Sequence, residues 1–181
     1  KQPNQEFPSF QDNARFRREF EIARRCVHAG VVRPLSLTQT GGHWTMVLAD
    51  IGGIALDKLL RQRALAPAEF FAIAVQLCDA VDAVHRQGVI HKDINPSNLV
   101  WNADAQLLQL IDFGIASELP QEAQALVQPH ALEGTLAYMA PEQTGRMNRL
   151  LDYRADLYAI GATFYALLAG QPPFVAVDAM E

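Results

Sequence analysis

Two short polar segments, separated by a predicted hairpin, constrain this chain more than any other feature. The first is HKDINPSN at residues 91–98, and the second is DFG at residues 112–114. Between them, residues 99–101 and 107–111 predict two short strands around a turn of Asn and Asp residues. Such a hairpin would bring the two polar segments back together.

Two carboxylates and an amide stand out in these segments, namely Asp93, Asp112 and Asn98. Two carboxylates in one cleft repel each other and are costly to bury unless a positive group lies beside them. Oxygen ligands of this kind suit magnesium, which is normally held by one or two carboxylates together with phosphate oxygens and water. The cluster therefore predicts a site for phosphoryl transfer.

The order of these segments resembles the protein kinase family, in which His-Arg-Asp is followed five residues later by Asn, and then by Asp-Phe-Gly. The succession continues with GT at residues 134–135, APE at residues 140–142 and a helix near Asp156. Residues 134–143 are most similar to bacterial Ser/Thr kinases, including kinase domains that open very large multidomain signalling proteins. The resemblance implies an ATP- and Mg²⁺-dependent enzyme that transfers the γ-phosphate of ATP to a protein hydroxyl.

The fold implied by this resemblance is α+β, the two-lobed protein kinase fold. Residues 1–51 would form the C-terminal part of the smaller lobe, with a regulatory helix, two strands and the hinge. Residues 52–181 would form the helical larger lobe, with the catalytic loop, metal loop, activation segment and central helix, incomplete at its C-terminus. We expect a chain that is cut off at both ends and continues into further domains of a larger signalling protein.

Catalytic roles follow from the same resemblance. Asp93 would orient the substrate hydroxyl and accept its proton, while Asn98 and Asp112 would hold the magnesium ions that bridge the ATP phosphates. Glu19, in the regulatory helix, would pair with the lysine that contacts ATP.

Binding and supporting roles are implied in the same way. Contacts to the nucleotide would come from Leu48, Ala49, Ile51, Val100 and Asp112. Substrate docking would involve Thr135, Ala137, Tyr138 and Met139. Structural support would come from His91, Phe113, Glu142 and Asp156, with His91 and Phe113 in the core and Asp156 bracing the catalytic loop.

The sequence departs from the family pattern in three places. No glycine-rich phosphate loop and no Val-Ala-Ile-Lys context precede residue 12, so we expect both the loop and the ATP-binding lysine to lie upstream, although Lys1 is close to the expected position. Asn95 stands where Ser/Thr kinases usually have a lysine that contacts the transferred phosphate, and it cannot supply that charge. Lys92 replaces an arginine that binds a phosphorylated activation loop, and lysine cannot make the same bidentate contact.

Hydrophobic spacing predicts the main elements. Asp12 would cap a helix from residue 12 to residue 27 with Phe16, Phe20, Ala23 and Val27 on its apolar face. Strands are expected at residues 31–37 and 43–48, and further helices at residues 56–60, 67–87 and 156–168.

Composition excludes several classes of protein. Fifteen Lys and Arg residues against twenty Asp and Glu residues give a net charge of −5 without a basic block, which argues against a nucleic-acid partner. No apolar run approaches the length of a membrane span, and the polar N-terminus favours a cytoplasmic location. The two cysteines form no CxxC or Cys/His cluster.

Two other functions remain open from the sequence. Asn95 and the missing lysine motivate a pseudokinase that binds nucleotide or a partner without efficient transfer, against which the presence of Asp93, Asn98 and Asp112 counts. Small-molecule phosphotransferases share the His-x-Asp-x-x-x-x-Asn loop but generally lack the GT-to-APE docking segment.

Overall fold

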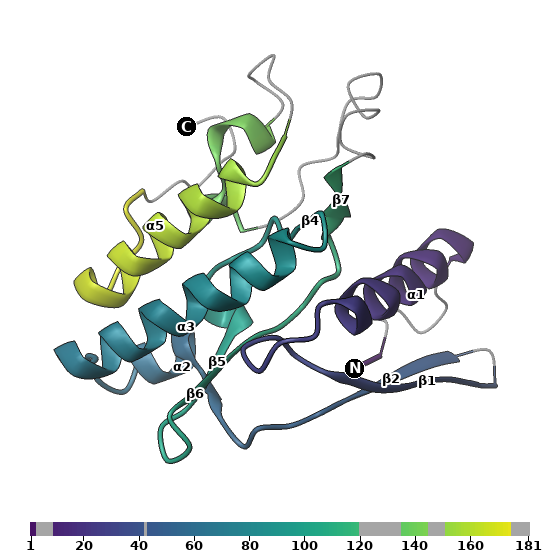
Figure 1. Cartoon of the computed structure of the whole chain (residues 1–181), viewed down its shortest axis with the longest axis horizontal. Helices are drawn as coiled ribbons and strands as arrows, with labels where there is room; N and C mark the ends of the chain where they lie inside the picture. Colours follow the sequence, from purple (N-terminus) through teal and green to yellow (C-terminus); the bar gives the residue numbers. More distant parts are fainter. Residues whose placement is uncertain (3–8, 42, 120–134, 145–150, 175–181) are drawn as a thin grey trace.

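The computed structural model describes residues 1–2, 9–41, 43–119, 135–144 and 151–174, and its elements fall into a smaller and a larger group (Figure 1). The smaller group contains helix α1 (Phe10–Arg25) beside a hairpin of β1 (Pro34–Thr40) and β2 (His43–Leu48). The larger group is mostly helical, with α2 (Leu56–Leu60), α3 (Pro67–His85) and α5 (Arg154–Ala169). This mixed architecture confirms the predicted α+β class.

Short strands complete the larger group. β3 (Ile54–Ala55), β5 (Leu99–Asn102) and β6 (Leu107–Leu110) form an antiparallel sheet in that order. β4 (Val89–Ile90) pairs with β7 (Ser117–Glu118). Single 3₁₀ turns follow at η1 (Pro96–Asn98), η3 (Leu136–Tyr138) and η4 (Pro141–Thr144).

Helix α1 begins two residues earlier than predicted, because its cap is Ser9 rather than Asp12. The Asp12 amide donates to Ser9 Oγ at 3.1 Å, while Asp12 Oδ2 accepts from the Ser9 amide at 2.9 Å, which is a capping box. The helix ends at Arg25, so Val27 lies beyond it and is 87% exposed instead of facing the core. Buried positions on the helix include Phe16 and Ile22.

Strand β1 is displaced by three residues from its predicted range of 31–37, whereas β2 has the predicted bounds. Leu37 pairs with Met46 and Thr40 with His43, but Val31 lies outside β1 and makes an isolated parallel bridge to Leu110 of β6. That bridge connects the smaller group to the larger sheet. On its other side β2 contacts Lys1, whose backbone N and O both bond to Met46, at 2.8 and 2.9 Å.

The core of the larger group lies where α3 faces α5 and the β5–β6 hairpin. Ile73, Leu77 and Val84 of α3 are completely buried, and Phe70 packs edge-on against Phe164 of α5 with ring centroids 5.6 Å apart. Burial of such side chains is the main favourable term for this part of the fold. Apolar spacing predicted both helices within two residues at each end.

A close backbone approach links the end of the hinge segment to β5. Gly52 has φ +67°, and a Cβ added to Gly53 would lie 2.7 Å from the carbonyl oxygen of Trp101. Glycine is therefore required at residue 53 if the chain is to run directly over β5. This contact places the hinge beside Val100.

In the described part of the chain, no helix is long and apolar enough to span a membrane.

Candidate active site

Paired strands on both sides bring the two polar loops together. On one side β5 and β6 form the predicted hairpin, and the Ile111 amide donates to the Asn98 carbonyl at 2.9 Å. On the other side β4 pairs with β7, so that Ile90 lies opposite Ser117. The catalytic loop (residues 91–98) and the metal loop (residues 112–116) therefore start and end at hydrogen-bonded strands, as the hairpin prediction required.

Helix α5 holds the catalytic loop through Asp156. This carboxylate is fully buried and accepts the backbone N–H of His91 and of Lys92, both at 2.8 Å. His85 Nε2 lies 2.8 Å from the same carboxylate, and Thr163 adds a bond to the Ile94 carbonyl at 3.3 Å. Asp156 thus contacts the loop backbone at the place predicted for it.

Each loop contains a residue in the left-handed backbone region next to a candidate catalytic group. Lys92 has φ 70° and Asp112 has φ 65°. Such conformations cost non-glycine residues roughly 1–3 kcal/mol and cluster at functional sites. At Lys92 the conformation is held at both ends, because its amide bonds to Asp156 and its carbonyl accepts from Gln143 Nε2 at 2.9 Å. Gln143 is a supporting residue that the sequence analysis missed.

His91 is the first residue of the catalytic loop, and its completely buried side chain lies between this loop and the metal loop. Its Nδ1 accepts from the Asp93 amide at 3.3 Å, so its Nε2 is the donor to the Ile111 carbonyl at 3.2 Å. The ring packs edge-on against buried Phe113 with centroids 4.8 Å apart. Burial lowers the pKa of His91, although the neighbouring carboxylates Asp156 and Asp93 oppose the shift. His91 is therefore part of the core between the catalytic loop and the metal loop.

The Asp93 carboxylate is surrounded by uncharged hydrogen-bond donors. Asn98 Nδ2 donates to Oδ2 at 2.8 Å, and Asn95 Nδ2 lies 3.1 Å from Oδ1. Both the amide and the hydroxyl of Thr135 donate to Oδ1 at 2.9 Å. The structure therefore brings together Asp93, Asn98 and Thr135, as the sequence predicted.

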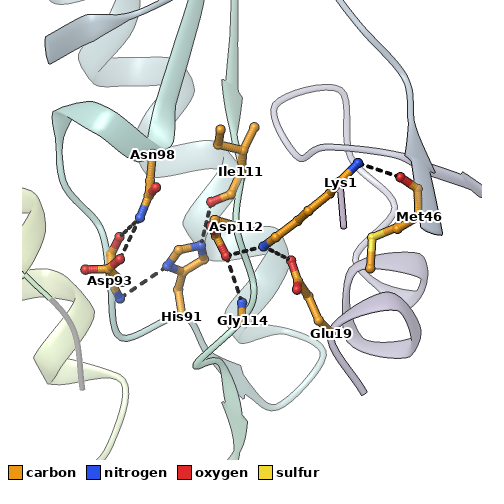
Figure 2. Close-up of polar contacts among 9 residues, drawn as sticks. All are labelled: Lys1, Glu19, Met46, His91, Asp93, Asn98, Ile111, Asp112 and Gly114. Atoms are coloured by element: carbon orange, nitrogen blue, oxygen red, sulfur yellow. Dashed lines mark hydrogen bonds and ion pairs between the residues drawn. The ribbon is translucent and has the colours of Figure 1, made fainter. Parts of the chain in front are cut away.

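A charged cluster lies on the other side of His91, and it overturns the expectation that the partner of Glu19 would be upstream. Lys1 Nζ is 2.6 Å from Glu19 Oε1 and 2.7 Å from Asp112 Oδ1. Figure 2 draws both contacts as dashed lines. No strand pattern surrounds Lys1 in the sequence, but the backbone bonds to Met46 hold it at the sheet. The signal that could have found it was its position, 18 residues before Glu19.

The charges of Lys1, Glu19 and Asp112 shift one another's pKa values. Burial opposes the charge on Lys1, but Glu19 and Asp112 together raise its pKa above the usual value. Burial also raises the pKa of Glu19, and Lys1 offsets that effect only in part. At Asp112 burial acts in the same direction, but the bond to Lys1, its charge and the Gly114 N–H lower the pKa overall. The ammonium thus favours the ionised form of Asp112.

A pocket of about 260 Å³ opens between the smaller and larger groups, beside this charged cluster. Its lining includes every residue predicted for nucleotide contact, namely Leu48, Ala49, Ile51, Val100 and Asp112. Lys1 stands in the same lining, together with Val32 and Ile111, which the sequence analysis did not assign. The walls are thus largely apolar, and one part of them carries charge.

The docking segment begins at Thr135 and continues to Glu142. Ala137 and Tyr138 belong to η3, Met139 is buried, and Glu142 lies in η4. Gly134 and most of the segment between the metal loop and Thr135 lie outside the described residues. Thr135 therefore carries the contact between this segment and Asp93.

The whole chain, residues 1–181, matches the family model described as the protein kinase domain. The chain belongs to the protein kinase family, whose members generally use ATP and Mg²⁺.

Curated relatives are bacterial proteins named Ser/Thr kinases. The chain is 36% identical to PknH of Mycobacterium tuberculosis over 91% of its length, and 31% identical to PknB of Mycolicibacterium smegmatis over 93%. It is 32% identical to pkn2 of Myxococcus xanthus over 88%. It spans only 26%, 27% and 19% of these three relatives, respectively.

Proposed function

We propose that this chain is the catalytic part of an ATP- and Mg²⁺-dependent protein Ser/Thr kinase of bacterial signalling. The observation that carries the proposal is the charged cluster: Lys1 lies 2.7 Å from Asp112 and 2.6 Å from Glu19, in a lysine–glutamate pairing that protein kinases need for activity. Asp93 and Asn98 lie across His91 from this cluster, in the adjoining loop (Figure 2).

The pocket lining supports a particular orientation for the nucleotide. Leu48, Val100 and the hinge backbone at Ala49 and Ile51 would contact the adenine ring, and Lys1 would contact the phosphates. Apolar walls with a few polar groups are typical of sites for small ligands. The triphosphate would thus extend from the hinge toward Asp112.

The side-chain oxygens of Asn98 and Asp112 are of the kind that magnesium prefers. Asn98 and Asp112 would hold it through one amide oxygen and one carboxylate, a set that phosphate oxygens and water normally complete. Among the described residues, no group of three or more His, Cys, Asp or Glu side chains is arranged to hold a metal without such help. When bound, magnesium would neutralise charge on the phosphate oxygens.

Asp93 would position the acceptor. Its Oδ1 already accepts from Thr135 and Asn95, and Oδ2 accepts from Asn98, so the carboxylate is fixed in orientation. In that orientation it would hold the hydroxyl of a substrate Ser or Thr and take up its proton. Residues 137–139 would face the amino acid beside that hydroxyl.

Asn95 supports one competing proposal, a regulatory module that binds nucleotide without efficient transfer, because no lysine stands at this position. A small-molecule phosphotransferase has less support, since such enzymes generally lack the GT-to-APE segment, whose Thr135 here bonds to Asp93.

Phosphate transfer from labelled ATP to a generic protein acceptor tests these functions in the full-length protein. Asp93→Ala and Asp112→Ala should each reduce transfer by about 100-fold or more. Phosphoamino-acid content of the product distinguishes Ser and Thr from other acceptors. Asp104→Ala, at the exposed turn of the β5–β6 hairpin, is the matched control and should transfer like the parent.

No transfer by the parent, with ATP still bound in a direct binding assay, would favour the regulatory module. Transfer to a small molecule but not to protein would favour the phosphotransferase. Retained transfer in both aspartate variants would rule out the catalytic role of Asp93 and the metal-binding role of Asp112.

A further inference from the structure

Asn95 is among the most buried polar residues of the chain, with 1% of its surface exposed. The catalytic loop places it two residues after Asp93, and its amide group is engaged on both sides. The oxygen arm accepts the Ser97 amide at 2.9 Å and also the Ser97 hydroxyl. The nitrogen arm lies 3.1 Å from Asp93 Oδ1, from the Asp93 carbonyl oxygen and from Thr135 Oγ1.

These two arms serve different parts of the site. Through the oxygen, Asn95 caps the single turn of η1, which leads to Asn98. Through the nitrogen, it joins Asp93 to Thr135, residues that are 42 positions apart in the chain. Asn95 thus adds a third contact between the catalytic loop and Thr135, beside the two direct bonds from Thr135 to Asp93.

Only a side chain with both a donor and an acceptor can make these contacts. An amide has two N–H donors and a carbonyl oxygen, whereas a lysine ammonium has three donors and no acceptor. With lysine at residue 95, the Ser97 amide would lose this acceptor in a partly buried position, and the loss of such a hydrogen bond costs roughly 0.5–1.5 kcal/mol. The surroundings of residue 95 are therefore built for an amide.

We propose that Asn95 is a positioning residue whose nitrogen arm fastens the docking segment to the catalytic carboxylate through an uncharged network. It aligns Asp93 and Thr135 for the incoming hydroxyl, and the residue contributes geometry instead of charge. The inference rests on the proposed kinase function, because alignment has a kinetic consequence only in a chain that transfers phosphate.

Two substitutions separate the arms in the full-length protein. Asn95→Asp keeps an oxygen for the Ser97 amide, because aspartate is as good a cap as asparagine, but it removes the N–H donors. Asn95→Ala removes both arms and adds no charge. The control is Gln106→Glu, the same amide-to-carboxylate exchange at an exposed turn residue whose side-chain amide bonds locally to the Ala103 carbonyl.

Kinetics give the first readout. Loss of hydrogen bonds to a charged group should lower kcat roughly 10- to 100-fold in both Asn95 variants. The KM for ATP should stay within about twofold of the parent, since Asn95 is not part of the nucleotide pocket lining. Gln106→Glu should match the parent in both constants.

Amide hydrogen exchange without nucleotide gives the second readout. The absence of nucleotide excludes repulsion between a new carboxylate and phosphate, and Asn95→Ala, which adds no charge, excludes repulsion between a new carboxylate and Asp93 as the cause. Asn95→Asp should speed exchange over residues 135–139 but leave residues 94–99 protected, whereas Asn95→Ala should speed exchange over both. A parent-like kcat and parent-like exchange at residues 135–139 in Asn95→Asp would reduce Asn95 to a helix cap and overturn the proposal.

The two readouts also separate this proposal from the kinase function. If the parent transfers no phosphate, the kinase function fails, and the exchange pattern alone decides whether Asn95 fastens the docking segment. If the parent transfers phosphate and Asn95→Ala exchanges like the parent at residues 135–139, the positioning role fails while the kinase function stands.

Discussion

The two sides of the active site are held by different kinds of interaction. On one side an ammonium lies between two carboxylates, Lys1 between Glu19 and Asp112. On the other side neutral amide and hydroxyl donors surround the single carboxylate of Asp93. The charged cluster draws its members from distant elements, whereas the neutral network is confined to the catalytic loop and the docking segment.

This difference separates a conformation-dependent half of the site from a preformed half. Lys1 is held by β2, Glu19 by α1 and Asp112 by the loop after β6, so the charged cluster exists only while the smaller and larger groups are aligned. Asp93 lies in a loop whose backbone at His91 and Lys92 is held by Asp156 of helix α5. Shifts of α1 should therefore break the first cluster and leave the second intact.

The largest effect on stability should come from Asp156→Ala, which tests whether the neutral network depends on α5. Removing this buried carboxylate leaves the His91 and Lys92 amides without their acceptor and should lower the free energy of unfolding by roughly 3–5 kcal/mol. Denaturant unfolding measures the change. Asp79→Ala, on the exposed side of α3, is the matched control. Equal denaturant midpoints for the two variants would show that the catalytic loop keeps its conformation without Asp156.

Lys1→Met should have the largest effect on the charged cluster and should act mainly on catalysis. Loss of the ammonium should lower kcat/KM for ATP by about 100-fold, or roughly 3 kcal/mol, because the charge that would face the phosphates disappears. Steady-state kinetics at varied ATP measures the loss. Hydrogen exchange at residues 94–99 should stay at the parent's rate. Faster exchange there would mean that the charged cluster and the neutral network are coupled instead of independent.

His91 lies between the clusters and should give the folded state a pH dependence. Since burial lowers its pKa, the folded protein binds fewer protons at this site than the unfolded chain, so stability is complete above the unfolded value of about 6.5 and falls as the pH drops below it. The slope from one proton is at most about 1.4 kcal/mol per pH unit. Unfolding of the parent and of His91→Phe, compared at pH 7 and pH 5.5, should show a smaller difference for the variant. An unchanged difference would assign the dependence to another group.

The smallest effect should come from the ion pair between Arg25 of α1 and Glu118 of β7, whose atoms are 2.6 Å apart. Both side chains are partly exposed, and such pairs contribute about 0.2–1 kcal/mol. A double-mutant cycle of Arg25→Gln and Glu118→Gln measures the coupling, which should shrink further in high salt. A coupling well above 1 kcal/mol would make this pair a structural tie between α1 and the larger group.

Much of the fold was predictable because apolar spacing and turn residues are local signals. Residues 67–85 and 154–169 show helical spacing, and the Asn and Asp residues of the β5–β6 turn are visible in the sequence. The two-residue strands β3, β4 and β7 carry no pattern of their own and depend on their partners. Val27 was misplaced because apolar spacing continues past the point where α1 ends.

Site residues that belong to ordered sequence motifs could be predicted. Site residues that are placed by contacts with distant parts of the chain could not. Asp93, Asn98 and Asp112 stand at recognisable spacings, and the residues predicted for the nucleotide all line one pocket. Lys1 has no local context, since the pairing that places it is with Met46, 45 residues away. The contacts of Asn95 likewise depend on Thr135, which only the folded chain brings near it.

Because Lys1 is bonded to Met46, strand β2 sets the distance between Lys1 and the hinge at Leu48 and Ala49. Met46 fixes Lys1 at one end, and the pocket lining begins two residues later with Leu48 and Ala49. Val47 lies between them and is 45% exposed, so its side chain can change without disturbing either end. An inserted or deleted residue there would instead displace the hinge from the lysine by about 3.3 Å and turn the following side chains to the opposite face. At residue 47 the presence of one residue is therefore more constrained than its identity.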